Sequence, residues 1–237
     1  MSNEKKSFNW KAITQHRLFL PIVCLLVVLL VNVIKTPNFF AVSIKNGVLY
    51  GYLVDVVNRA SELVIVAIGM TLVTAASGGQ DISVGAVMAV AAAVCCQILS
   101  GGQVSTNELM NSMALAIIAA IIVAAICGAF NGFLVANLGI QPMVATLILS
   151  TAGRGIAQLI TKGQITYVRV GSFKIMGGYI GKCPIPTPIF FAIAAIIIVN
   201  LVLKKTALGL YIESVGINGS ASRLVGLNST MIKFLTY

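Results

Sequence analysis

Residues 113–130 read MALAIIAAIIVAAICGAF, an unbroken run without a charged side chain. A helix of ~20 apolar residues is long enough to span the hydrocarbon core of a bilayer, so this run predicts a transmembrane helix. Of the 237 residues, 58% are hydrophobic and 9% are charged, whereas an ordinary soluble domain has roughly 25% charged residues. With so few charges the chain cannot cover a water-facing surface, and we expect it to fold in a membrane.

Five further apolar runs lie on either side of this one, at residues 18–34, 62–76, 82–99, 143–160 and 188–203. We therefore predict an all-α fold, a polytopic transmembrane bundle of about six complete helices. A seventh apolar segment starts at Met231 and reaches only Tyr237, so we expect this transmembrane domain, residues 18–237, to be incomplete at its C-terminus.

The segment before Leu18 is polar and basic, and the apolar run that follows it has no small-residue cleavage site. We expect this segment to lie in the cytoplasm and the first helix to be retained, in a multi-pass membrane protein. The net charge of +10 is scattered through short loops. Anionic membrane lipids are therefore the expected partner of the basic residues, and nucleic acid is not.

A short polar stretch, SGGQDISVG at residues 77–85, separates two apolar runs. It is too short for an exposed domain, so it predicts a helix break at or within the membrane. Irregular backbone at that depth is tolerated where it lines a wet cavity, which makes Gln80, Asp81 and Ser83 candidates for a substrate pathway. A compatible alternative is a tight turn in which Asp81 caps the following helix.

Arg154 lies in the second half of the apolar run that starts at Met143. At ~1.5 Å per residue it would sit roughly 16 Å deep, near the bilayer midplane. A guanidinium there either pairs within the bundle or lines the pathway, and Gln158 one turn later would extend the same polar stripe. Because each charge is costly alone, we predict that Asp81 and Arg154 approach one another or share a cavity.

Two glycines, Gly128 and Gly132, form a small-xxx-small pair that predicts close helix packing. Asn131 lies between them, and we expect it to satisfy a helix end. Residues 204–230 form a long loop, cytoplasmic in this topology, in which residues 212–228 suggest one short helix.

Phosphate-loop, metal-binding and nucleophile-triad motifs are not found in the sequence, so we expect no catalysis, no metal site and no cofactor. Two other classes stay open on this evidence. An ion-coupled secondary transporter of a small polar solute should have several carboxylates buried among its helices, where Asp81 is the one candidate. A membrane scaffold that transports nothing would have no need of Arg154 or of the glycine break.

Several short motifs together resemble the inner-membrane permeases of ribose, xylose and galactofuranose ABC importers, and galactofuranose permeases most of all. They are IGMTLV at 68–73, SGGQDISVGA at 77–86, NG at 131–132, IQP at 140–142, ATL at 145–147, GRG at 153–155, TKGQ at 161–164, KTALG at 205–209 and VGIN at 215–218. The resemblance covers the chain from about Asn38 to its end. It implies a permease that forms the translocation path, pairs with itself or a homologue, receives sugar from a periplasmic binding protein and couples to a separate ATP-binding subunit.

The resemblance also implies that ASRLVG at residues 221–226 belongs to the loop that docks on the ATPase. The candidate coupling residues are Glu213, Gly216, Asn218, Ala221, Arg223 and Gly226. Ser222 replaces an alanine of the family pattern, and Gln80 replaces an aliphatic residue before the aspartate. These departures bear on docking and on selectivity respectively.

Overall fold

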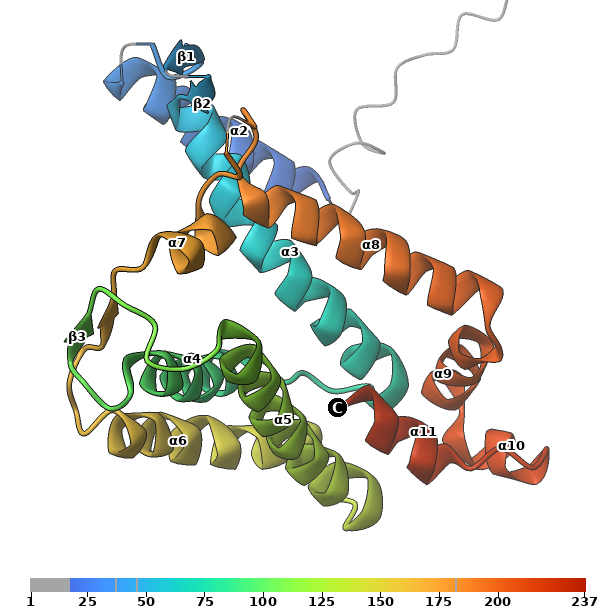
Figure 1. Ribbon diagram of the computed structural model, residues 1–237. Coiled ribbons are helices and arrows are strands. Elements are labelled where there is room, and N and C mark those ends of the chain that lie inside the picture. Colours follow the sequence, from blue (N-terminus) through green and yellow to red (C-terminus); the bar gives the residue numbers. More distant parts are fainter. Residues whose placement is uncertain (1–17, 37, 46, 182) are drawn as a thin grey trace, which may run out of the picture. The chain divides into compact units, whose positions relative to one another are not determined.

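The computed structural model describes residues 18–36, 38–45, 47–181 and 183–237, which form ten α-helices, one π-helical turn and four short strands (Figure 1). The predicted cytoplasmic segment, residues 1–17, lies outside the described residues. The chain divides into two compact units, Met1–Val56 and Val57–Tyr237. Each is described separately below.

The first unit contains helix α2 (Phe19–Lys35) and a hairpin of strands β1 (Ser43–Lys45) and β2 (Val48–Tyr50). The hairpin is antiparallel, with Ser43 opposite Tyr50. No residue of α2 is buried within the described chain, although nearly all of its side chains are apolar. A helix that is apolar on every side is typical of a membrane span, because lipid then covers its surface.

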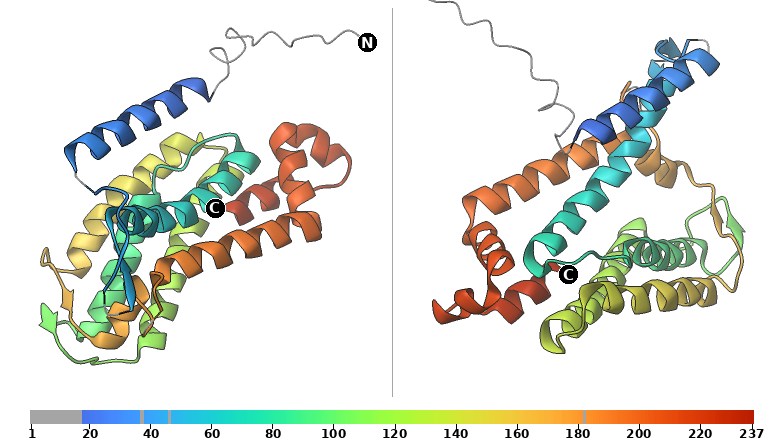
Figure 2. Two further views of the ribbon diagram at one scale, coloured as in Figure 1. Left: turned by 90° about the horizontal axis from the view of Figure 1, so that it is seen from above. Right: turned by 180° about the vertical axis from the view of Figure 1, so that it is seen from behind.

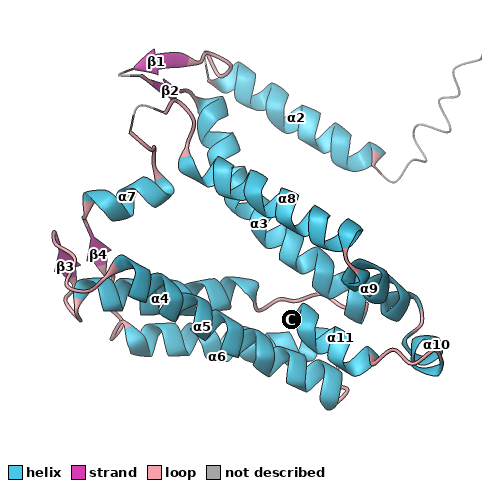
Figure 3. Ribbon diagram, turned by 45° about the vertical axis from the view of Figure 1, so that its right-hand side comes forward, coloured by secondary structure: helices cyan, strands magenta, loops and turns pink. Residues whose placement is uncertain are grey.

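Helix α3 (Tyr52–Ser77) begins in the first unit and continues into the second. The second unit then has α4 (Val84–Ser100), α5 (Met113–Gly132) with the π-helical turn η1 (Phe133–Asn137), and α6 (Pro142–Ile160). Helix α4 packs against both α5 and α6 (Figure 1). The loops at one end of this group are joined by a short parallel pair, β3 (Ser105–Thr106) and β4 (Tyr167–Val168), which lie side by side in Figure 3.

The rest of the second unit is α7 (Gly171–Gly177), α8 (Thr187–Lys205), α9 (Ala207–Ile217), α10 (Gly219–Leu224) and α11 (Ser229–Thr236). Helices α9, α10 and α11 follow one another at one end of the unit (Figure 2).

Helix α11 folds back onto α5 and η1. A Cβ added at Gly132 would lie 3.0 Å from the Phe234 ring, and one at Gly128 would overlap the carbonyl oxygen of Tyr237. The close packing predicted for this glycine pair is therefore confirmed, with α11 as the partner.

The predicted all-α class is confirmed, and the six expected helices correspond to α2, α3, α4, α5, α6 and α8. Four described segments are long and apolar enough to cross a membrane: α3, α5 continued through η1, α6 and α8. Helices α2 and α4, with 17 residues each, are somewhat shorter. The prediction of a single short helix within residues 212–228 is wrong, because two helices, α9 and α10, meet there at Asn218.

Candidate functional site

The break between α3 and α4 is held against the start of α6. Gly78 adopts a left-handed conformation (φ +70°) immediately after α3, which glycine accommodates without strain. At Gly79 a Cβ would come within 2.5 Å of the Pro142 ring, so only glycine permits this approach. The backbone N–H of Ile82 then donates to Thr146 Oγ1 over 3.1 Å. These contacts hold the irregular backbone between α3 and α4 in one conformation.

Asp81 is directed back onto its own segment by two hydrogen bonds. Its Oδ1 accepts the backbone N–H of Ser83 over 2.7 Å and the Ser83 hydroxyl over 2.6 Å. The expected capping role for Asp81 is wrong, because α4 begins at Val84 and Ser83 is its N-cap residue. Asp81 therefore stabilises the turn that leads into the helix and does not reach the free amides of its first turn.

The Asn131 side chain reaches from α5 to the break between α3 and α4, although we expected it to satisfy a helix end. Its Nδ2 donates to Ser83 Oγ over 2.8 Å, and its side chain is 1% exposed. A serine hydroxyl has one hydrogen, and here that hydrogen is given to Asp81. Asn131 must then present its amino group to Ser83, which leaves its Oδ1 buried without a hydrogen-bond partner among the described residues.

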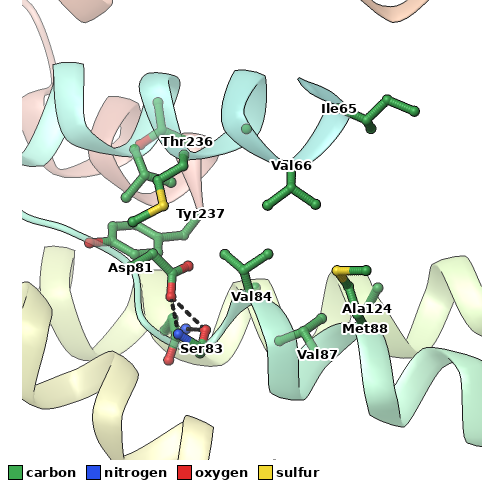
Figure 4. Close-up of a pocket in the computed structure, with 15 residues that line it drawn as sticks. Ile65, Val66, Asp81, Ser83, Val84, Val87, Met88, Ala124, Thr236 and Tyr237 are labelled. Carbon is green, nitrogen blue, oxygen red and sulfur yellow. Dashed lines mark hydrogen bonds between the residues drawn. The ribbon is translucent and has the colours of Figure 1, made fainter. Parts of the chain in front are cut away.

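Asp81, Ser83 and Asn131 all lie at a partly open cavity of about 290 Å³ that is lined by residues of α3, α4, α5 and α11. Figure 4 shows Asp81, Ser83 and Tyr237 at one end and Ile65, Val87 and Met88 toward the other. The Tyr237 hydroxyl lies 3.3 Å from Ser77 Oγ, at the end of α3. The cavity thus has one polar end and an apolar remainder.

The other three candidate pathway residues do not line this cavity. Gln80, Arg154 and Gln158 are exposed in the described chain. Asp81 bonds to Ser83, and no hydrogen bond or ion pair joins it to Arg154 among the described residues. The approach of Asp81 and Arg154 to one another or to a common cavity therefore stays a prediction.

The exposure of Arg154 follows from the geometry of α6. Its buried face is formed by Ala145, Thr146, Leu149, Ser150 and Gly153. Arg154 is turned about 100° from Gly153, because an α-helix has ~3.6 residues per turn. The position of Arg154 along α6 was predictable from the sequence, but the direction of its side chain was not.

The predicted coupling segment, α9 and α10, is held by its own polar side chains. Thr206 caps α9 by accepting the N–H of Leu208, and Asn218 caps α10 by accepting those of Ser220 and Ala221. Ser222, the departure from the family pattern, is buried and donates to the Asn218 carbonyl over 2.9 Å. Its hydroxyl therefore stabilises α10 from within.

The remaining coupling candidates have different positions. Gly216 is where α9 meets α3, and a Cβ there would overlap the carbonyl oxygen of Ala75. Glu213 lines a groove between α3, α8 and α9. Arg223 bonds to Ser229 and Thr230, at the start of α11. Ala221 and Gly226 are exposed, and Gly226 has a left-handed backbone (φ +88°).

The exposed apolar side chains around this segment were not predicted from the sequence. Ile217 is 81% exposed, Leu224 90% and Val225 77%. A signal was available in the pattern, since large aliphatic residues stood beside Asn218 and Gly226 in a stretch expected to face water. Exposed apolar side chains grouped in this way are typical of a protein interaction surface.

These apolar helices and the broken segment define a multi-pass α-helical membrane protein. Residues 52–237 match the family described as branched-chain amino acid transport system, permease component, and the chain belongs to that family. No solved structure matches it.

Among curated relatives, the galactofuranose transporter permease protein YtfT of Escherichia coli is 43% identical over 98% of this chain and 64% of its own length. The fructose import permease protein FruF of Bifidobacterium longum is 37% identical over 96% of this chain and 63% of its own. The ribose import permease protein RbsC of Escherichia coli is 30% identical, over 91% and 63% respectively. The chain spans slightly less than two thirds of the length of these relatives.

Proposed function

We propose that the chain is a membrane-spanning permease subunit of an ATP-driven monosaccharide importer in a bacterial inner membrane. Membership of a transport permease family supports the permease role. The names of three relatives, which refer to galactofuranose, fructose and ribose, support a sugar as the solute. The chain forms part of the translocation path, and the energy comes from a separate ATPase.

The observation that carries this proposal is the polar cavity at the break between α3 and α4. Asp81, Ser83 and Asn131 bring a carboxylate, a hydroxyl and an amide together among apolar helices. Placing such groups inside a membrane is costly, and in transporters broken helices with polar groups commonly line the substrate route.

Three protein partners follow from this function. A periplasmic sugar-binding protein delivers the solute, an ATP-binding subunit drives the conformational change, and a second permease subunit, identical or homologous, completes the path. Membrane lipids cover the apolar faces, and nucleic acid is not a partner.

We place the contact with the ATPase at the turn that joins α10 to α11. Leu224 and Val225 project from this turn with almost no cover from the described chain. A few buried anchors carry most of the free energy of a protein interface, and a leucine that is 90% exposed before binding has a large apolar area to bury. Arg223 and Gly216 support the shape of the segment from behind.

The test is uptake of radiolabelled galactose, fructose and ribose into membrane vesicles, with and without internal ATP and with a proton uncoupler. We expect uptake of at least one sugar to require ATP and to persist with the uncoupler. Leucine and valine serve as comparison solutes because of the family description. Uptake that requires an ion gradient and not ATP would instead establish the ion-coupled transporter, and absence of any uptake would favour a scaffold.

A further inference from the structure

Helix α9 lies across the ends of α8 and α3. A Cβ added at Gly209 would overlap the carbonyl oxygen of Leu203, near the end of α8. One added at Gly216 would overlap the carbonyl oxygen of Ala75, near the end of α3. The two glycines are separated by about 10 Å along the helix, at ~1.5 Å per residue. The two close contacts therefore hold α9 as a bridge between these helix ends (Figure 1).

This bridge forms one end of a groove between α3 and α8. The part of the groove beside α9 has a volume of about 580 Å³. A smaller part of about 240 Å³ continues along α3 and α8, and most of the side chains that line it are apolar. The two parts share Thr71, Leu72 and Leu203, so they form one continuous groove.

The groove has the dimensions of one acyl chain in a bilayer leaflet. Along α8 it extends from Ile196 to Lys204, which is about 12 Å at ~1.5 Å per residue. The hydrocarbon layer of one leaflet is roughly 15 Å thick. The smaller part would hold about eight groups of the size of a water molecule, at ~30 Å³ each. A helix ~10 Å across could not enter it, whereas a chain of methylene groups could.

The wide end of the groove has one charge of each sign. Lys204, near the end of α8, and Glu213, on α9, both line it and are exposed. Neither forms an ion pair or a side-chain hydrogen bond among the described residues. Lys204 ends an apolar span, a position that corresponds to the level of lipid headgroups. A ligand that fits this groove therefore has an anionic group, a cationic group and an apolar chain.

We propose that this groove binds a phospholipid with an ethanolamine headgroup. The phosphate pairs with Lys204, the ammonium group pairs with Glu213, and one acyl chain lies between α3 and α8. An ethanolamine ammonium donates hydrogen bonds as a lysine ammonium does, whereas choline has no N–H to donate. A phosphatidylglycerol headgroup has a net negative charge, which Glu213 repels.

The bound lipid connects the last described span, α8, to the segment that follows it, because its headgroup contacts both α8 and α9. The site is separate from the turn between α10 and α11 where we place the contact with the ATPase. It requires only that the chain lies in a membrane, and it does not depend on which solute is carried.

The experiment measures lipid binding to the purified, delipidated protein in detergent by native mass spectrometry. Phosphatidylethanolamine, phosphatidylcholine and phosphatidylglycerol with identical acyl chains are compared. Wild-type protein should bind phosphatidylethanolamine about fivefold more tightly than either of the others. Glycerophosphoethanolamine, which has the headgroup without the chains, should not bind at the same concentrations, because the apolar part of the groove then stays empty.

Glu213→Lys is the most informative variant, because it places two cations at the wide end of the groove. Its preference should reverse, with phosphatidylglycerol bound about fivefold more tightly than phosphatidylethanolamine. Lys204→Gln should weaken phosphatidylethanolamine binding about fivefold. Lys205→Gln is the matched control, because Lys205 is exposed and does not line the groove. It should bind all three lipids as wild type does.

Equal affinities of the wild type for the three lipids would overturn the proposal, and so would the same order of affinities in Glu213→Lys as in wild type. A second test uses Leu210→Cys, in the groove, after the native cysteines are replaced with serine. Cross-linking of two copies through this cysteine would show that a second subunit occupies the groove, and would also overturn the proposal. Since lipid binding is measured and uptake is not, a failure here leaves the proposed transport function intact.

Discussion

Arg223 Nε donates a hydrogen bond of 2.6 Å to Ser229 Oγ, and this bond joins α10 to α11. A second bond of 3.1 Å runs from Arg223 Nη2 to Thr230 Oγ1. Ser229 is 2% exposed, so its hydroxyl has no access to water as a substitute partner. Arg223 therefore holds α10 and α11 together, and its charge is not simply presented to a partner.

Replacing Arg223 with alanine should lower stability. Ser229 loses its partner in a buried position, which we expect to cost about 1–2 kcal/mol. Thermal unfolding of the purified protein in detergent measures this effect. Arg169→Ala is a suitable comparison, because Arg169 lies outside this segment. Its guanidinium carbon is 5.7 Å from the centre of the Tyr167 ring. Equal unfolding temperatures for Arg223→Ala and wild type would contradict the structural role.

Leu224→Ser should leave the stability of the protein unchanged and should weaken its binding to the ATP-binding subunit. The side chain is 90% exposed and contributes little to folding, so the unfolding temperature should stay within about 1 °C of wild type. Co-purification of the ATP-binding subunit should fall at least fivefold, because a buried leucine anchor contributes roughly 1.5–3 kcal/mol. Unchanged co-purification, with unchanged sugar-stimulated ATP hydrolysis, would show that this turn is only a connector.

Gly216→Ala should disrupt the crossing of α9 and α3. The added Cβ overlaps the Ala75 carbonyl oxygen, and a backbone atom cannot rotate away as a side chain does. We expect a loss of about 1–3 kcal/mol, as for other overpacked sites, together with weaker coupling. Gly155→Ala is the matched control on α6, where an added Cβ meets nothing within 4 Å. Both variants are compared by thermal unfolding and membrane level, and equal values for the two would contradict the close crossing.

Thr146→Val should loosen the helix break while keeping the shape of the side chain. The Ile82 N–H loses its acceptor, at a cost of about 1–3 kcal/mol if the amide stays buried. Hydrogen exchange at residues 78–83 should become faster. Thr151→Val provides the control, since its hydroxyl bonds to the Leu147 carbonyl within its own helix. Equal protection in both variants would show that Thr146 does not hold the break.

The helices and the break could be predicted from the sequence because both depend on local composition. Long apolar runs identified each long helix, and the Gly78–Gly79 pair marked the place where α3 must end. The packing role of Gly128 and Gly132 followed from their spacing on one helix face. Asn218 also belongs to a residue type that is favoured at a helix N-cap, and it caps α10.

The long-range polar contacts could not be predicted in this way. A membrane helix is apolar on nearly every side, so its periodicity does not separate the face toward protein from the face toward lipid. The face of α6 on which Arg154 lies could therefore not be predicted. The bond between Asn131 and Ser83 spans 48 positions of sequence and depends on how α5 packs against α4.

The most direct test of the central claim is chemical modification of the cavity. Val87→Cys would be made after the five native cysteines are replaced with serine, with Ile118→Cys as the control on the exposed face of α5. We predict that a thiol reagent blocks ATP-dependent sugar uptake by Val87→Cys, that transported sugar slows this modification, and that Ile118→Cys stays active. Unimpaired uptake by fully modified Val87→Cys would contradict the claim that this cavity lies on the translocation path.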